Sequence, residues 1–156
     1  MKATASALLL LLLLSSASAQ EKPDFSGLYL LNTTKPGKHQ KASPPIYLRV
    51  TQSERGLEAS FTEGGQTRTR KYFLDGSPSV NPTEGAGSSK DMARLKGKAL
   101  LIESVVQVRG TVLHIKDKWQ LSRDSQTLTI HSSVEGASLG ITTDLGSLDQ
   151  VYTRQH

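Results

Sequence analysis

The sequence predicts an all-β protein, in which about eight or nine short strands form one antiparallel meander that closes into a barrel or curls strongly. Three observations lead to this prediction. Short runs of alternating apolar and polar residues recur after residue 20, and turn residues separate them. No window in that region carries apolar residues at helical spacing over three turns. Most connections are short enough for hairpins, and a meander hides its edge strands best by closing on itself.

The composition is that of one globular domain. The chain has 156 residues, of which 36% are hydrophobic and 21% are charged. Lys and Arg number 19 against 14 Asp and Glu, so the formal charge is +5. The chain contains no cysteine, which excludes a disulfide framework and a thiolate metal site. These values also exclude an intrinsically disordered chain.

The first 19 residues have the pattern of a secretory signal peptide. Lys2 precedes an apolar run over residues 7–14, and Ala17-Ser18-Ala19 is a small-residue cleavage site. The apolar run is too short to cross a bilayer, which takes about 20 residues, so we expect no membrane span. We therefore expect cleavage near Ala19, a secreted or periplasmic protein, and a single all-β domain over residues 20–156.

The expected strands follow in chain order, and each is justified by its alternation and its flanking turns. The first two flank a long Pro-bearing connection, the third and fourth flank a Gly-Gly turn, and the last four surround Arg-Gly and Arg-Asp-Ser-Gln turns and a Gly-rich segment. The strands are Gly27–Leu31, Ile46–Gln52, Leu57–Thr62, Thr67–Leu74, Ala99–Val108, Thr111–Leu121, Thr127–Val134 and Gln150–Arg154, with a further short one at Ala93–Lys96.

The middle of the chain predicts its own strand register. A two-residue turn at Arg109-Gly110 places Leu100 opposite Trp119. A loop over residues 123–126 then places Trp119 opposite Ile130. Both turns bring apolar residues onto the same face, and a slip of one residue in either would scatter them.

Three longer connections interrupt the meander. Thr33–Pro45 is basic, Ser77–Asp91 is rich in Ser, Pro and Gly, and Glu135–Ser147 holds three glycines. Loops of this length are uncommon unless they are mobile or functional. We expect either surface connections or a rim around the mouth of the barrel.

One polar residue stands out on the predicted apolar face. Asp117 lies between Ile115 and Trp119, and its nearest polar neighbours in the register are Ser104 and Ser132. A buried carboxylate must be paired, hydrogen-bonded or protonated. It could form an ion pair with one of four arginines, or it could anchor a ligand in a mainly apolar cavity. The four arginines are Arg49, Arg68, Arg70 and Arg154. The candidate ligand-binding residues are Asp117, Trp119, Ile102, Ile115, Ile130 and Ser132, and the apolar members could equally be plain core.

Other chemistries find little support, so we predict no enzyme, no catalytic residues, no cofactor and no metal site. The four histidines have no metal-ligand spacing, and there is no G-x-S-x-G motif or phosphate-binding glycine loop in a helical context. Arg68, Arg70 and Lys71 adjoin Tyr72 and Phe73 in a partial imitation of a nucleic-acid stacking surface. Export argues against that function, so we expect no nucleic-acid partner.

Several segments carry a resemblance to known families. The opening Asp24-Phe25-Ser26-Gly27-Leu28-Tyr29-Leu30-Leu31-Asn32 resembles the F-S-G-x-W-x-L-N start of an uncharacterised family of exported bacterial β proteins. Residues 95–103, 117–124, 127–130 and 151–154 extend that likeness. The opening also resembles, more distantly, the G-x-W strand of lipocalins. This resemblance implies a lipocalin-like, calycin-type barrel with Tyr29 and Arg154 in the places of the Trp and Arg that close its floor.

These observations together predict an exported, non-enzymatic β-barrel that binds a small, largely apolar molecule. A second hypothesis is a filled β-domain that acts as an interaction module. Its partner would be an envelope protein or an anionic envelope polymer, bound through the basic loop Thr33–Pro45. A cavity above roughly 300 Å³ would favour the carrier.

Overall fold

The computed structural model describes residues 22–32 and 44–156. Every regular element in these ranges is a β-strand, and there are ten of them. In chain order the strands are β1 (Gly27–Leu31), β2 (Ile46–Gln52), β3 (Gly56–Glu63), β4 (Gln66–Phe73), β5 (Asp75–Thr83), β6 (Gly87–Lys96), β7 (Ala99–Val108), β8 (Thr111–Leu121), β9 (Thr127–Ser138) and β10 (Ile141–Gln155). The predicted signal peptide and most of the basic loop Thr33–Pro45 lie outside the described residues.

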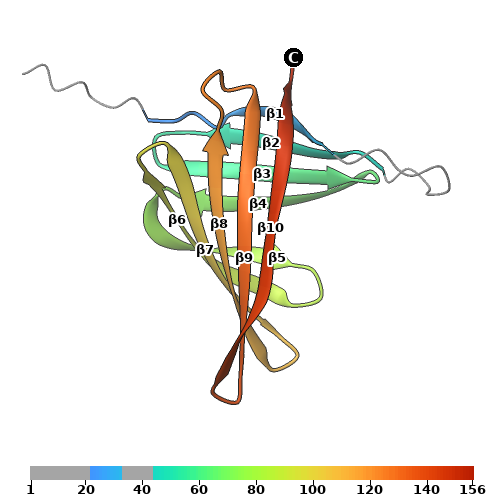
Figure 1. Cartoon of the computed structure of the whole chain (residues 1–156), viewed down its shortest axis with the longest axis vertical. Coiled ribbons are helices and arrows are strands. Elements are labelled where there is room, and N and C mark those ends of the chain that lie inside the picture. The colour runs from blue at the N-terminus through green and yellow to red at the C-terminus, as the bar shows by residue number, and fades with distance from the viewer. Residues whose placement is uncertain (1–21, 33–43) are drawn as a thin grey trace, which may run out of the picture.

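The strands form one antiparallel meander that is nearly closed. The order in the sheet is β4-β3-β2-β1-β10-β9-β8-β7-β6-β5, so the first strand pairs with both the second and the last. Strands β1 to β4 run across the molecule, and β7 to β10 run nearly perpendicular to them on the other side of the interior (Figure 1). This arrangement confirms the predicted fold class of an antiparallel, lipocalin-like barrel.

The predicted register of the central strands is confirmed. Leu100 pairs with Trp119, and Trp119 pairs with Ile130. The turn between β7 and β8 explains this accuracy, because Arg109 and Gly110 both have positive φ angles, 49° and 83°. Two consecutive residues of this kind define the type I′ turn, whose twist matches that of a two-residue hairpin.

Two of the three predicted long connections are wrong, because strands replace them. Ser77–Asp91 forms most of β5 and the start of β6, which pair with each other. The alternation was hidden because Pro78 and Pro82 interrupt it, although proline is tolerated in β5, the last strand of the sheet order. Its inward residues are also polar, as described below.

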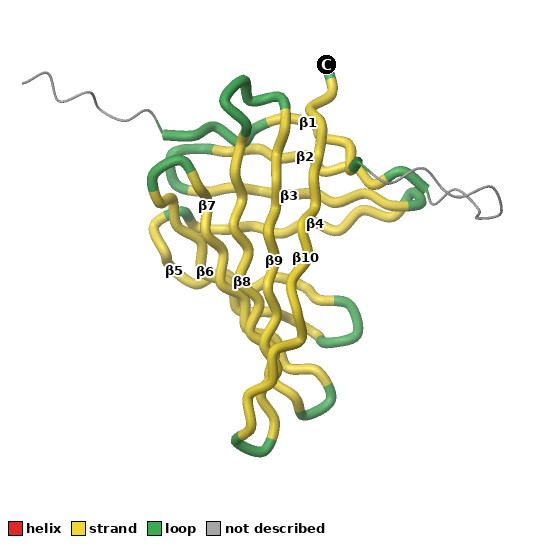
Figure 2. The backbone as a smooth tube through the Cα atoms, viewed as in Figure 1, coloured by secondary structure: helices red, strands yellow, loops and turns green. Residues whose placement is uncertain are grey.

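The third long connection, Glu135–Ser147, is a hairpin instead of a loop. Strand β9 continues to Ser138 and β10 begins at Ile141, with a turn at Leu139 and Gly140 that again has two positive φ angles. A bulge between Asp144 and Gly146 shifts the register. The hairpin projects well beyond the body of the barrel (Figure 2).

The apolar core fills one end of the barrel. Phe25 meets the single tryptophan, Trp119, edge to face, with the ring centroids 6.3 Å apart and the planes at 75°. Leu48, Leu100 and Leu128 are fully buried beside them. A ring pair of this geometry adds about 0.5–1.5 kcal/mol beyond the apolar area that it buries.

The same end is closed by the pair that the lipocalin resemblance implied. The Arg154 guanidinium lies 5.0 Å from the centroid of the Tyr29 ring and donates to the Tyr29 hydroxyl at 2.7 Å. It also donates to the carbonyl oxygens of Ser26 and Ser125, both at 2.8 Å. One side chain thus ties β1, β10 and the turn before β9 together.

Candidate ligand-binding site

A cavity of about 530 Å³ opens where β2, β3, β4 and β10 come together. We call it the mouth cavity. Its lining residues are Ile46, Phe61, Glu63, Gly64, Gln66, Arg68, Arg70, Gln150 and Tyr152. Tyr152 is only 1% exposed and therefore belongs to the floor, whereas Arg68 lies at the rim and pairs with Glu84. The volume falls within the roughly 300–1,000 Å³ usual for small-molecule sites.

A group of polar side chains lies inside the barrel next to this cavity. We call it the interior polar cluster, and its members are Arg70, Asn81, Asp91, Ser104, Asp117 and Ser132. Asp91 is 0% exposed, and Ser104 lies directly opposite it on β7. The Arg70 Nη1 atom lies 3.9 Å from the Asp91 Oδ2 atom, and Arg70 also lines the mouth cavity.

Asn81 closes the sheet between β4 and β5 with its side chain. Its Oδ1 accepts from the Lys71 amide at 2.7 Å, and its Nδ2 donates to the Lys71 carbonyl at 2.9 Å. The same Nδ2 donates to the Asp91 Oδ2 at 2.6 Å. The two strands are not neighbours in the hydrogen-bonded sheet, so the amide takes the place of a backbone rung. Asp91 therefore orients the residue that closes the barrel.

Asp117 lies in the interior as its register predicted, between Ile102 of β7 and Ser132 of β9. Burial raises the pKa of its carboxyl; the Ser132 hydroxyl and the Arg70 guanidinium act in the opposite direction, and the Asp91 charge adds to the rise. Its Oδ1 atom is buried and has no hydrogen-bond partner among the described residues.

The ion pair that was one alternative for Asp117 is not formed with any of the four arginines within the described residues. Arg70 pairs with Asp91, Arg68 pairs with Glu84, and Arg154 is held by Tyr29 and backbone oxygens. Arg49 points outward from β2. The sequence did not predict that Arg70 pairs with Asp91 instead of Asp117, because Asp91 lies in a segment for which no strand was predicted.

The floor tyrosine links Asp117 to the mouth cavity. Burial, together with the nearby Asp117 charge, raises the pKa of Tyr152 to about 12. Burial also raises the pKa of Tyr72, which follows Lys71, the backbone partner of Asn81. Both phenols therefore stay protonated at neutral pH and can donate or accept hydrogen bonds without adding charge.

The six predicted ligand-binding residues share one interior face but do not line the mouth cavity. Ile102, Trp119 and Ile130 belong to the buried core, and Asp117, Ile115 and Ser132 are half-buried. Their role in binding stays a prediction. Sequence reasoning missed Asn81, Asp91 and Tyr152 as members of the site. The available signal was the two-residue spacing of Ser89, Asp91, Ala93 and Leu95, which places all four on one face of β6.

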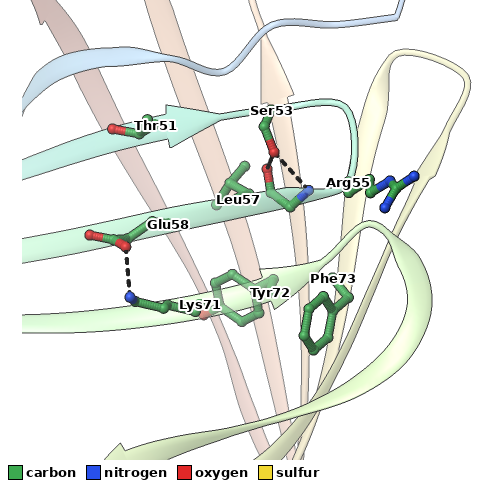
Figure 3. A pocket seen from close by; sticks show the side chains of 9 residues that line it. Thr51, Ser53, Arg55, Leu57, Glu58, Lys71, Tyr72 and Phe73 are labelled. Carbon is green, nitrogen blue, oxygen red and sulfur yellow. Dashed lines mark hydrogen bonds and ion pairs between the residues drawn. The ribbon is translucent and has the colours of Figure 1, made fainter.

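A second, smaller pocket of about 380 Å³ lies on the outer face of β2, β3 and β4 (Figure 3). Its outward side chains include Thr51, Phe73 and the ion pair of Lys71 and Glu58 at 3.2 Å. This pocket is open to solvent and lies outside the barrel, so we do not assign the binding site to it.

Residues 22–32 and 44–156 contain neither a cluster of metal ligands nor a helix that could span a membrane. This part of the chain holds no group of three or more metal-ligating side chains. His131 is exposed on β9 and pairs with Asp149 of β10. No helix in these ranges could span a membrane.

Comparison with known proteins places the fold. No protein-family model and no curated protein sequence matches the chain. Among solved structures it is similar to the REP1-NXSQ fatty acid transporter, with a TM-score of 0.57 and 8% identity over 85% of this chain and 96% of that one. It is also similar to apo lipid binding protein 8 of Caenorhabditis elegans, with a TM-score of 0.60 and 6% identity over 84% and 95% of the two chains.

A third similar structure is a secretory abundant heat soluble protein of Ramazzottius varieornatus, with a TM-score of 0.56 and 10% identity over 87% and 98%. At these identities the likeness concerns the fold alone. The chain therefore shares the barrel fold of these structures, which is consistent with the distant calycin-like resemblance.

Proposed function

We propose that the protein is an exported, non-enzymatic carrier of a small, largely apolar ligand. The observation that carries this proposal is the mouth cavity, whose Ile46 and Phe61 walls and Tyr152 floor adjoin the barrel interior. The fold agrees with it, since similar structures are named as a fatty acid transporter and a lipid binding protein. Export rests on the signal-peptide pattern of residues 1–19.

The arrangement of the interior polar cluster favours binding over catalysis. Asp91 is occupied by Asn81 and Arg70, and its position maintains the closure between β4 and β5. Asp117 lies opposite Ser132 and Ile102, away from a histidine or a second carboxylate in direct register. Groups held in this way can orient a ligand's polar end within apolar walls.

Native mass spectrometry of the protein from the producing organism's exported fraction tests the proposal. We expect a stoichiometric small adduct that disappears after extraction with organic solvent, and an N-terminus near residue 20. A bare mass that also fails to take up added long-chain alcohol would overturn the carrier proposal.

The filled interaction module is the second candidate, and the packed half of the barrel favours it. Phe25, Leu100 and Trp119 are at most 1% exposed and belong to the core at that end. In this case the basic loop Thr33–Pro45 would bind an envelope protein or anionic polymer. Retention of the protein on an anionic polysaccharide at physiological salt, abolished by neutralising that loop, is the result expected for this function.

A further inference from the structure

We propose that the ligand's polar end is a cationic nitrogen, so that the cargo is an amine-bearing amphiphile whose head group is bound by Asp91 and Asp117. This inference rests on the proposed carrier function and names its ligand class. It follows from the charge balance of the barrel interior, from two unpartnered carboxylate oxygens, and from the prior engagement of the nearby arginines.

The interior polar cluster has an excess of negative groups. It contains the carboxyl groups of Asp91 and Asp117 and one guanidinium, that of Arg70. A bound cation would balance the two carboxylates, whereas a bound anion would place three negative groups around one positive group. Uncompensated charge in a buried site is costly, so the interior favours a cationic ligand.

The two carboxyl groups also have unused hydrogen-bond acceptors. Asp91 is 0% exposed, and its Oδ1 has no partner among the described residues, although its Oδ2 is bound by Asn81. The Oδ1 atom of Asp117 is also buried and also has no hydrogen-bond partner among the described residues. An ammonium group supplies three donors and no acceptor, which matches this deficit.

The arginines near the mouth cavity are already engaged. Arg68 pairs with Glu84 at the rim, and Arg70 lies 3.9 Å from Asp91. Arg154 is at the closed end, and its described side-chain hydrogen bonds are directed to Tyr29, Ser26 and Ser125. A carboxylate ligand would therefore have to displace an existing partner from its arginine.

The mouth cavity adjoins these groups through Arg70 and Tyr152. Arg70 lines the cavity and adjoins Asp91, and its side chain is 27% exposed. Tyr152 forms the floor and is close enough to Asp117 to sense its charge. The head group would pass these two side chains, and the apolar tail would remain along Ile46 and Phe61.

Three ligands of equal chain length test the proposal, namely dodecylamine, dodecanol and dodecanoate. Each is titrated by calorimetry, below its micelle concentration, into the delipidated full chain. A charge-assisted hydrogen bond strengthens binding by roughly tenfold or more, so we expect dodecylamine to bind at least about tenfold more tightly than dodecanol. Dodecanoate should bind more weakly than dodecanol.

Two variants identify the binding groups. In Asp117→Asn and Asp91→Asn the preference for amine over alcohol should fall by about tenfold for each lost carboxylate. Asp91→Asn could disturb folding through Asn81, and Asp117→Asn then carries the test alone. The matched control is Asp149→Asn, which neutralises an exposed aspartate on β10 and should leave the preference unchanged.

The neutral alcohol separates the two proposals. If dodecanol binds but the amine gains nothing, or if dodecanoate binds most tightly, the cationic-ligand inference is overturned and the carrier function stands. An amine preference that survives in Asp117→Asn and Asp91→Asn alike would also overturn the inference. If none of the three ligands binds, the carrier function fails and the inference fails with it.

Discussion

At the scale of single residues, Asp117 makes the stability of the fold depend on pH. Burial raises the pKa of this carboxyl above its ordinary value of 3.8, with Ser132 and Arg70 acting against the rise and Asp91 adding to it. The folded state thus holds the proton to higher pH than the unfolded chain does. Its stabilising contribution is complete below pH 3.8 and is lost as the pH rises through the folded-state pKa.

The substitution Asp117→Asn should remove this dependence, since an amide does not ionise. Relative to the wild-type protein, the variant should become more stable as the pH rises from below 3.8 towards neutrality. Urea denaturation at a series of pH values measures the difference. Stability curves that run parallel over the whole range would contradict the assignment, and Glu54→Gln, at an exposed position, provides the control.

Asn81 is a second single residue that we expect to contribute strongly to the stability of the fold. The change Asn81→Ala leaves the Lys71 amide and carbonyl without their partner and removes the donor to Asp91. Because Asn81 and Asp91 are buried, we expect a loss of roughly 2–4 kcal/mol in the free energy of unfolding. Hydrogen exchange should show faster exchange of the Lys71 amide. An equally large loss in Gln120→Ala, at an exposed position on β8, would argue against a specific role for Asn81.

At the scale of the elements, the β7–β8 turn allows a test in two directions. Arg109 and Gly110 both have positive φ angles, and a Cβ atom added at Gly110 would meet nothing within 4 Å. Gly110→Ala should therefore cost about 1 kcal/mol through backbone strain alone. Arg109→Asn should stabilise the protein by up to about 1 kcal/mol, because Asn tolerates this conformation better. Thermal unfolding measures both changes, and shifts of the same sign would refute the turn assignment.

The β7–β8 turn also explains why the register of the central strands could be predicted from the sequence. The register of β7, β8 and β9 followed from Arg109-Gly110 and from the match of Trp119 with Ile130, two local signals that agree. Strands β5 and β6 carry the opposite pattern, since Asn81 and Asp91 point inward while Val80 and Met92 are exposed. Polar interior residues defeat a rule that assigns strands by apolar alternation.

The candidate site was missed for the same reason that the two strands were. Asp117 could be noticed because it interrupts an apolar face, whereas Asp91 lay in a segment without a predicted strand. Its pairing with Arg70 and Asn81 joins β4, β5 and β6, and a contact across the gap in a barrel follows from closure, not from local sequence. Rules that predict strands from apolar alternation fail where the side chains that face the barrel interior are polar.

At the scale of the whole molecule, the barrel has one closed, apolar end and one open, polar end. Phe25, Trp119 and the Tyr29–Arg154 pair fill the closed end. The mouth cavity and the interior polar cluster occupy the other. Changes at the closed end should therefore affect unfolding without changing ligand preference.

The substitution Arg154→Ala tests this division. It removes three hydrogen bonds, to Tyr29, Ser26 and Ser125, and the cation–π contact with Tyr29. We expect a loss of about 2–4 kcal/mol in the free energy of unfolding. Arg154→Lys should recover only part of it, because an ammonium lacks the planar fork that reaches three acceptors in fixed directions. Arg123→Ala, at an exposed turn position, should have little effect.

Ligand titration of the same variants completes the argument. While Arg154→Ala remains folded at low temperature, its ratio of amine to alcohol affinity should equal that of the wild-type protein, because Arg154 contacts no member of the interior polar cluster among its described hydrogen bonds. Asp117→Asn should show the reverse. Its ratio of amine to alcohol affinity should change, while the fluorescence of Trp119 should stay the same and thereby show that the closed end is intact. A changed ratio in Arg154→Ala would mean that the two ends are coupled, and the barrel would then have to be treated as one cooperative binding unit.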